Sequence, residues 1–77
     1  MIAHVTGGLD GVLRVAMVLR SRRYSVRDLV VDVREGSVVS EIRATVVLTT
    51  QQADLLLERL RRLTAVVDAH TIETDVS

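Results

Sequence analysis

The chain contains no cysteine, and Tyr24 is the one aromatic residue among its 77 residues. Without cysteine there is no disulfide framework, no thiolate metal site and no cysteine nucleophile. Sheets that recognise RNA stack aromatic side chains on the bases, so a single tyrosine argues against that function. Ten basic and ten acidic residues cancel. A neutral chain has no long-range field to attract nucleic acid or an anionic membrane, so neither is an expected partner.

Long hydrophobic segments are also missing. The longest apolar run, Val15 to Leu19, is far too short to span a bilayer. Residues 1–4 do not combine a charged region with a long apolar core, as a signal peptide does. We therefore expect a soluble protein, with the cytoplasm as the default location. Residues 1–77 form one domain, and a domain this small buries only about 60% of its unfolded surface, so partners are expected to add stability.

The N-terminal part predicts a strand, a glycine-rich loop and a helix. Ile2 to Thr6 is a short β-prone run that places Ala3 and Val5 on one face. The loop after it consists of Gly7, Gly8, Leu9, Asp10 and Gly11. Asp10 is expected to be the N-cap of the helix, since its carboxylate can accept hydrogen bonds from free amides of the first turn.

The predicted first helix is unusually apolar. Its core stripe is Val12, Val15, Ala16 and Leu19, and its basic end is Arg20, Arg22 and Arg23. Leu13, Met17 and Val18 extend the apolar arc beyond what packing on one sheet requires. This excess predicts an association surface.

The next two predicted strands form a hairpin. Tyr24 to Arg34 is the second strand, with Glu35-Gly36 as the two-residue turn and a longer turn with a bulge as the alternative. The short turn places Val33 opposite Val38, Val31 opposite Ser40, Leu29 opposite Ile42, Val30 opposite Glu41 and Asp28 opposite Arg43. The length of the third strand, through Leu48, suits a central position in the sheet.

The C-terminal part predicts a capped helix and a last strand. Thr49 and Gln52 have the spacing of a capping box. The core stripe of this helix is Ala53, Leu56, Leu57, Leu60 and Leu63, and Glu58 stands four residues before Arg62. The last strand is Val66 to Ile72. The order β-α-β-β-α-β predicts an α+β, ferredoxin-like fold, with a four-stranded antiparallel sheet and both helices on one face.

Catalytic and metal sites are weakly indicated. His4 and His70 on neighbouring strands lack a clear third metal ligand. The carboxylates of Asp28, Asp32 and Glu41 alternate with arginines, which is typical of solvated cross-strand pairs. Ser25, His70 and Asp68 have no nucleophile-elbow motif to support a triad. We expect no catalytic residue, no metal site and no cofactor bound by this chain.

The glycine-rich loop has two readings. Three glycines in five residues permit close approach of a ligand and leave helix amides free for a carboxylate. The same residues also make an ordinary turn. The sequence leaves both open.

The first helix and the segments after it resemble the ACT domain, and in particular the short regulatory subunits of acetohydroxyacid (acetolactate) synthase. The matching residues are Val12, Val15, Ala16, Val18, Leu19, Arg20, Arg22, Arg23, Tyr24, Val26 and Leu29, then Asp54, Leu55, Leu56, Leu60, Arg62, Leu63 and Val66. The resemblance implies a regulatory subunit in branched-chain amino-acid biosynthesis that activates a separate catalytic subunit. Thiamine diphosphate, magnesium and, where present, FAD belong to that subunit. Effector-binding members hold an amino acid at a dimer interface, between the first loop and the first helix.

This sequence departs from the effector-binding pattern. Aligned on Tyr24, the pattern expects Asn near Gly7, Gly near Asp10, Gly at Arg23 and Asn at Ser25. Aligned on the loop, Gly11 takes the motif glycine and Gly8 replaces the asparagine. The side-chain amides that would hold an amino acid are missing in both alignments, as in the short valine-insensitive subunits. We therefore expect weak or absent valine binding there.

The sequence supports three functional hypotheses. The first is a regulatory subunit acting by protein contact, the second a stand-alone ACT domain that binds a small amino acid and regulates another enzyme, and the third a dimerisation module without ligand. The candidate ligand-binding residues are Gly7, Gly8, Leu9, Asp10, Gly11 and Ser25. The candidate interface residues, in a homodimer or with the catalytic subunit, are Leu13, Met17 and Arg20.

Overall fold

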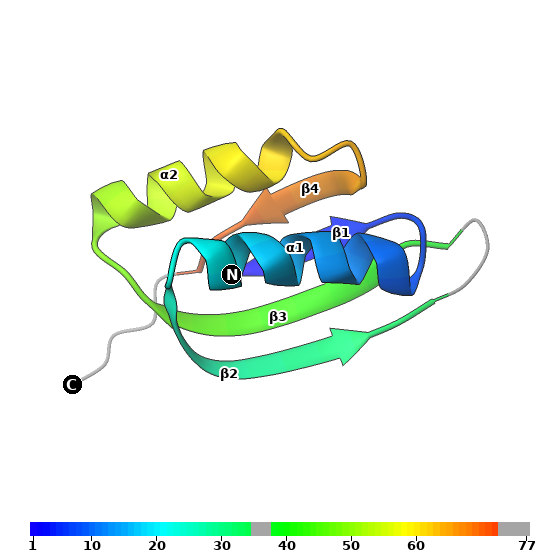
Figure 1. The fold of residues 1–77 in the computed structure, drawn as a ribbon, viewed down its shortest axis with the longest axis horizontal. Helices are drawn as coiled ribbons and strands as arrows, with labels where there is room; N and C mark the ends of the chain where they lie inside the picture. Colours follow the sequence, from blue (N-terminus) through cyan, green and yellow to red (C-terminus); the bar gives the residue numbers. More distant parts are fainter. Residues whose placement is uncertain (35–37, 73–77) are drawn as a thin grey trace.

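The computed structural model describes residues 1–34 and 38–72, which form one sheet and two helices (Figure 1). The elements in order are β1 (Ile2–Val5), α1 (Leu9–Ser21), β2 (Ser25–Asp32), β3 (Ser40–Val47), α2 (Thr50–Arg61) and β4 (Val66–His70). The strand order is β2-β3-β1-β4, and every neighbouring pair is antiparallel. This confirms the predicted ferredoxin-like fold. It also confirms that β3 is central.

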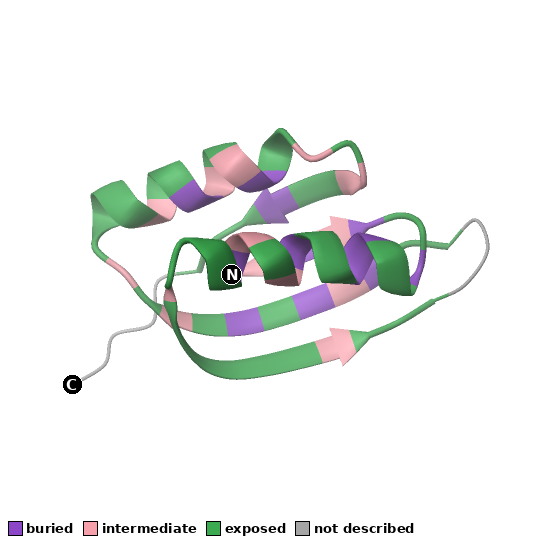
Figure 2. Cartoon of the chain, in the orientation of Figure 1, coloured by how far each residue is buried: buried purple, intermediate pink, exposed green. Residues whose placement is uncertain are grey.

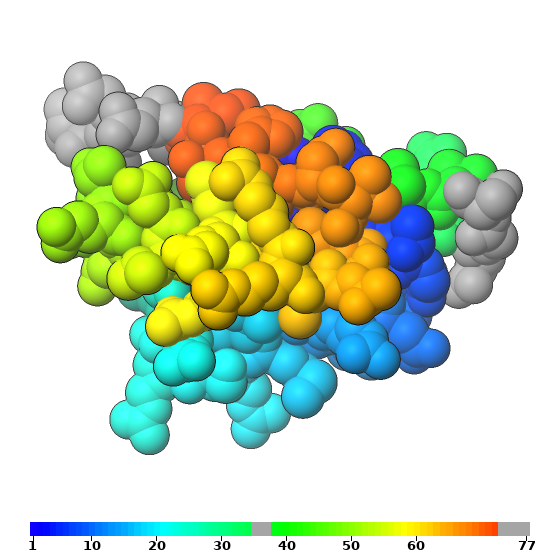
Figure 3. Space-filling view, turned by 90° about the horizontal axis from the view of Figure 1, so that it is seen from above, coloured from blue at the N-terminus to red at the C-terminus, as the bar shows by residue number. Residues whose placement is uncertain are grey.

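The core lies between the helices and one face of the sheet. α2 packs on β4, and α1 packs on β3 and against α2, so that α2 touches both β4 and α1 (Figure 3). Figure 2 marks buried residues on both helices and on β1, β3 and β4. The hydrophobic core cluster consists of Ala3, Val5, Val12, Val15, Leu19, Ile42, Leu56, Leu60 and Ala69. The predicted faces of β1 and α1 are therefore confirmed.

The predicted capping box of α2 is also confirmed. The backbone N–H of Gln52 donates to Oγ1 of Thr49 at 3.2 Å, and that of Thr49 donates to Oε1 of Gln52 at 3.0 Å. Arg62 donates to Glu58 at 2.7 Å, as expected for residues four apart. Leu60 is fully buried. No helix among residues 1–34 and 38–72 is long and apolar enough to cross a membrane.

The start of α1 differs from the prediction. The N-cap is Gly8, not Asp10, and no side chain caps the helix. Helical geometry begins at Leu9, because Gly7 and Gly8 adopt positive φ angles of 84° and 59° and turn the chain before Asp10 is reached. Asp10 lies in the first turn, where its charge still meets the positive end of the helix dipole.

The predicted register of the hairpin is wrong by two residues. Val31 lies opposite Ile42, Val30 opposite Arg43, Asp32 opposite Glu41 and Leu29 opposite Ala44, with an irregularity between Val26 and Asp28. The predicted pair of Asp28 and Arg43 therefore does not form. β2 ends at Asp32, so the connection to β3 is longer than a two-residue turn. The predicted turn at Glu35-Gly36 lies outside the described residues.

The predicted core face of β2 is largely uncovered. Leu29 is 47% exposed, and Val33 is exposed beyond the end of the strand. Val31 is half-buried against the core. β2 is the edge strand beside β3, whereas the helices pack on β3 and β4, so neither helix shields Leu29. The alternation of apolar and polar residues identified the core-facing side of this strand, but it did not show how much of that side the helices cover.

Candidate functional site

The loop between β1 and α1 brings together five of the predicted ligand-binding residues. Gly7 is exposed and Gly8 is buried, and the two positive φ angles reverse the chain between strand and helix. The backbone N–H of Val12 donates to the carbonyl of Gly8 at 3.2 Å, which closes the first turn of α1. The N–H of Thr6 donates to the carbonyl of Ala65 at 2.8 Å and fixes the loop to the start of β4.

Gly11 has a packing role in this loop. It is buried within the first turn of α1. A Cβ atom at this position would lie 2.0 Å from the carbonyl oxygen of Thr6 and 3.2 Å from Cγ2 of Val5. The space that glycine provides here is occupied by the protein's own backbone. Gly11 is therefore explained without a ligand, whereas Gly7 and Gly8 are explained by the turn.

Leu9 and Asp10 are both exposed at the loop. Among the described residues the carboxylate of Asp10 has no hydrogen-bond or ion-pair partner. Since Gly8 is the cap, this carboxylate is available to a ligand's ammonium group. Sequence reasoning assigned it to the helix cap instead.

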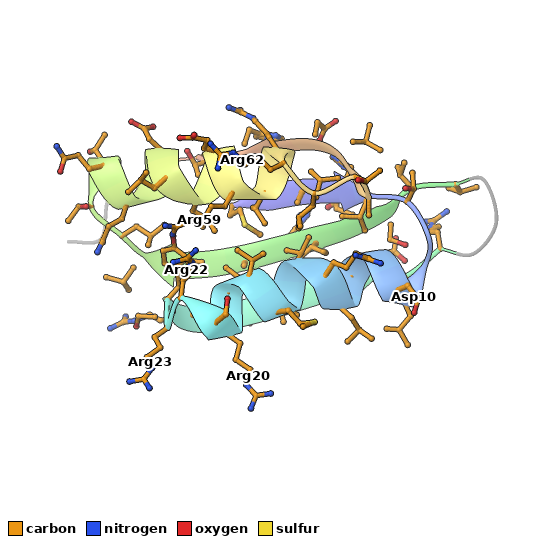
Figure 4. The ribbon with its side chains drawn as sticks, turned by 45° about the horizontal axis from the view of Figure 1, so that its top comes forward. Asp10, Arg20, Arg22, Arg23, Arg59 and Arg62 are labelled. Carbon is orange, nitrogen blue, oxygen red and sulfur yellow. The ribbon has the colours of Figure 1, made fainter. Side chains whose placement is uncertain are left out.

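Ser25 is not brought to the loop within one chain. It begins β2, which follows the C-terminal end of α1, whereas the loop precedes the N-terminal end. Figure 4 shows Asp10 at one end of α1 and Arg20, Arg22 and Arg23 at the other. A helix of 13 residues is roughly 20 Å long. Ser25 and the loop can share a site only if another chain contributes one of them.

The candidate interface residues are exposed on α1. Leu13 is 49% exposed and Met17 is 66% exposed, and Arg20 follows near the end of the helix. Leu9, at 53% exposure, joins them because residues four apart lie on one helix face. We call Leu9, Leu13 and Met17 the α1 apolar row. Sequence reasoning placed Leu9 in the loop, although its spacing from Leu13 was the signal that assigns it to this row.

Two of the arginines at the end of α1 take part in the turn that ends the helix. Arg23 has a φ of 55°, and its N–H donates to the carbonyl of Arg20 at 3.1 Å. The N–H of Tyr24 donates to the carbonyl of Leu19 at 3.2 Å, which completes a Schellman motif with arginine in place of the usual glycine. The hydroxyl of Tyr24 accepts a hydrogen bond from Arg59 of α2 at 3.1 Å. These contacts fix the end of α1 against α2.

The two histidines are on neighbouring strands, as the sequence predicted. His70 is opposite Ile2, and His4 is opposite Asp68. The described residues hold no group of three or more His, Cys, Asp or Glu side chains able to bind a metal ion.

His4 bridges three strands on the sheet face that turns away from the helices. Its Nδ1 lies 2.6 Å from Oδ1 of Asp68 on β4, and its Nε2 lies 3.4 Å from Oε2 of Glu41 on β3. The hydrogen bond to Asp68 raises the pKa of His4 above its ordinary value, and Glu41 adds to this effect. Arg43, which pairs with Glu41, lowers the pKa of that carboxyl group. This is a network of surface ion pairs.

Two hollows lie away from the loop, one where β3 leads into α2 and the other along β1, β2 and β3. Their volumes are about 390 Å³ and about 360 Å³, and both are lined by Met1, Thr45, Val46 and Ile72. Met1 lies just before β1, whereas the glycine-rich loop lies just after β1, at the opposite end of the strand. Neither hollow therefore includes any residue of the loop. Sequence reasoning did not identify this region.

The arrangement thus offers an exposed apolar helix row, an edge strand, a loop whose Asp10 carboxylate has no partner among the described residues, and a separate pair of hollows. Comparison with known family models, with curated proteins and with solved structures finds no match to this chain.

Proposed function

We propose that this chain is a non-catalytic regulatory subunit of the ACT type that acts by protein contact, with acetohydroxyacid synthase as the regulated enzyme. The observation that carries the contact mode is the α1 apolar row, whose three side chains are about half exposed or more. Such a row costs free energy in water and is stabilised when a partner covers it. The identity of the enzyme rests on the sequence resemblance alone.

The proposed assembly is a homodimer that presents a larger surface to the catalytic subunit. β2 supports it, because an edge strand of eight residues exposes a row of unpaired backbone groups. Leu29, which α1 leaves uncovered, adds apolar area to the same side. A small domain gains stability from each such contact, and homo-oligomers with twofold symmetry are the commonest solution.

Light scattering on the purified chain at tens of micromolar tests the dimer. We expect a dimer for the wild type and a shift towards monomer for Leu13→Lys, because a charge would then oppose burial of the row. Leu55→Lys is the matched control, since Leu55 on α2 is also 49% exposed but lies outside the row. A monodisperse wild-type monomer would contradict the dimer.

The regulatory role is tested by mixing the chain with the thiamine-diphosphate-dependent large subunit from the same organism. We expect a stable complex and increased acetolactate formation, both reduced by Leu13→Lys and unchanged by Leu55→Lys. A large subunit whose activity and elution volume do not respond to the chain would refute the proposal.

A second candidate function is a stand-alone ACT domain that binds a small amino acid and regulates another enzyme. Asp10 favours it, because its carboxylate is not used as the helix cap and can accept from an ammonium group. Calorimetric titration with valine tests it. A micromolar dissociation constant that is lost in Asp10→Ala would support this candidate over the contact-only mode.

A further inference from the structure

The two edges of the sheet are β2 and β4, and they differ in what covers them. β2 is eight residues long, and among the described residues no side chain forms a hydrogen bond to its backbone. β4 is five residues long, and α2 packs on it (Figure 1). From the last turn of α2, the guanidinium of Arg61 donates to the carbonyl oxygen of Ala69 on β4 at 3.0 Å.

The hydrogen-bond pattern of β1 shows that this carbonyl points away from the sheet. The backbone groups of a strand bond alternately to its two neighbours. Met1 exchanges both of its backbone hydrogen bonds with Ala44 of β3, so the odd residues of β1 bond to β3 and the even residues bond to β4. The pairs that bond across β1 and β4 are Ile2 with His70 and His4 with Asp68. Ala69 lies between the two β4 members of these pairs, so its carbonyl faces the open side of the edge.

We infer that Arg61 closes the β4 edge to strand addition, so that the sheet can be extended only at β2. An added strand would bring a backbone N–H to about 2.9 Å from the carbonyl oxygen of Ala69, where a nitrogen of Arg61 already lies at 3.0 Å. The guanidinium is charged, and a charged donor forms a stronger hydrogen bond than a neutral one. The added strand would also remove water from this charge, which costs free energy.

The consequence is a limit on assembly. A chain with two open edges can pair at both of them, and repeated pairing builds an open-ended sheet. With β4 closed, two copies that pair through β2 present only closed edges, so growth stops at the dimer. This limit rests on the proposed homodimer, whereas the closure of β4 does not.

Light scattering and thioflavin T fluorescence of Arg61→Ala test the inference. We expect a mass that rises with protein concentration and reaches about twice the wild-type value or more at tens of micromolar, because the freed edge adds strands. Arg62→Ala is the matched control, since Arg62 is the neighbouring exposed arginine and pairs with Glu58 instead of the sheet edge. This control should keep the wild-type mass.

A double variant, Arg61→Ala with Val67→Lys, separates an opened edge from a misfolded chain. Val67 of β4 is 58% exposed, so lysine is tolerated there, and a lysine on an edge strand opposes strand addition. We expect the double variant to return to the wild-type mass, whereas aggregation of an unfolded chain would persist. Three results would each overturn the inference: a wild-type mass for Arg61→Ala, the same growth in Arg62→Ala, or continued growth in the double variant.

The same measurements distinguish this inference from the proposed function. If the wild type is a monomer, the homodimer is contradicted, yet Arg61→Ala should still associate through β4. If the wild type is a dimer and Arg61→Ala is also a dimer, the closure of β4 is contradicted and the homodimer is not.

Discussion

Gly11→Ala separates the two readings of the glycine-rich loop. In an ordinary helix this substitution stabilises by about 1 kcal/mol, because alanine has the better helix propensity. Here the new methyl group would lie 2.0 Å from the carbonyl oxygen of Thr6 and 3.1 Å from its carbonyl carbon. No side-chain rotation relieves a contact with backbone, so either the loop or the helix must move.

The size of the effect depends on what has to move. Overpacking in a closed site costs about 1–3 kcal/mol. Thr6 is also held by its N–H, which donates to Ala65 at 2.8 Å, and moving it puts a hydrogen bond worth about 1 kcal/mol at risk. The gain of about 1 kcal/mol in helix propensity offsets roughly the cost of the hydrogen bond. We expect a net loss of roughly 1–3 kcal/mol in the free energy of unfolding.

Urea unfolding followed by circular dichroism measures this difference, provided that the slope of the transition is unchanged. Arg14→Ala is the control, since Arg14 is exposed on the same helix and its replacement should change stability by no more than about 0.5 kcal/mol. A Gly11→Ala variant as stable as the wild type would refute the packing argument. Packing against Thr6 would then not account for the glycine.

Three further predictions concern stability. Leu60→Ala should cost about 2–5 kcal/mol in urea unfolding, because Leu60 is fully buried, and a cost near zero would mean that the buried face of α2 is misassigned. Arg23→Gly should raise stability by about 0.5–1 kcal/mol, since relief of a left-handed φ of 55° exceeds the entropy that glycine loses, and an unchanged urea midpoint would contradict this. Stability should fall as pH rises through the raised pKa of His4, because the bond to Asp68 favours the protonated form; its contribution to stability is complete below the ordinary pKa of 6.5 and is lost above the raised pKa. The step should be below about 1 kcal/mol at this surface site and absent in His4→Asn, and the same step in that variant would show that another group titrates.

The second helix was predictable because its signals are local. Thr49 and Gln52 are three residues apart, and one turn of backbone is enough to make both hydrogen bonds of the capping box. The leucine stripe repeats with the helical period, so the buried face of Leu60 follows from spacing alone. No distant part of the chain had to be placed first.

The hairpin was only half predictable, for a physical reason. Alternation has a period of two residues, so it fixes which face a side chain occupies but cannot detect a register shift of two. Val31 was predicted opposite Ser40 and lies opposite Ile42, and both pairings place it on the same face of the sheet. How much of that face is covered depends on where the helices pack. No pattern within β2 itself reveals that Leu29 stays half exposed.

The predicted role of Asp10 as helix cap was wrong for a different reason. Asp10 was assigned as the cap because of its residue type, yet two positive φ angles in the glycines before it start the helix earlier. The larger hollow is lined by Arg27 of β2 and Asp54 of α2, among other residues, and no local motif links these two. Such a hollow can be found only when tertiary structure places an edge strand next to the start of a helix.

The exposed apolar surface and the core of this protein arise from the same packing. α2 packs on β4 and α1 on β3, so both helices are displaced towards one edge of a four-stranded sheet. The displacement buries Ala69 and Leu56 but leaves Leu29 on the far strand without a helix above it. α1, which carries the apolar row, is the helix nearer to β2. A partner that covered this strip would complete the layer that α1 leaves open, which is why we place association at β2 and α1.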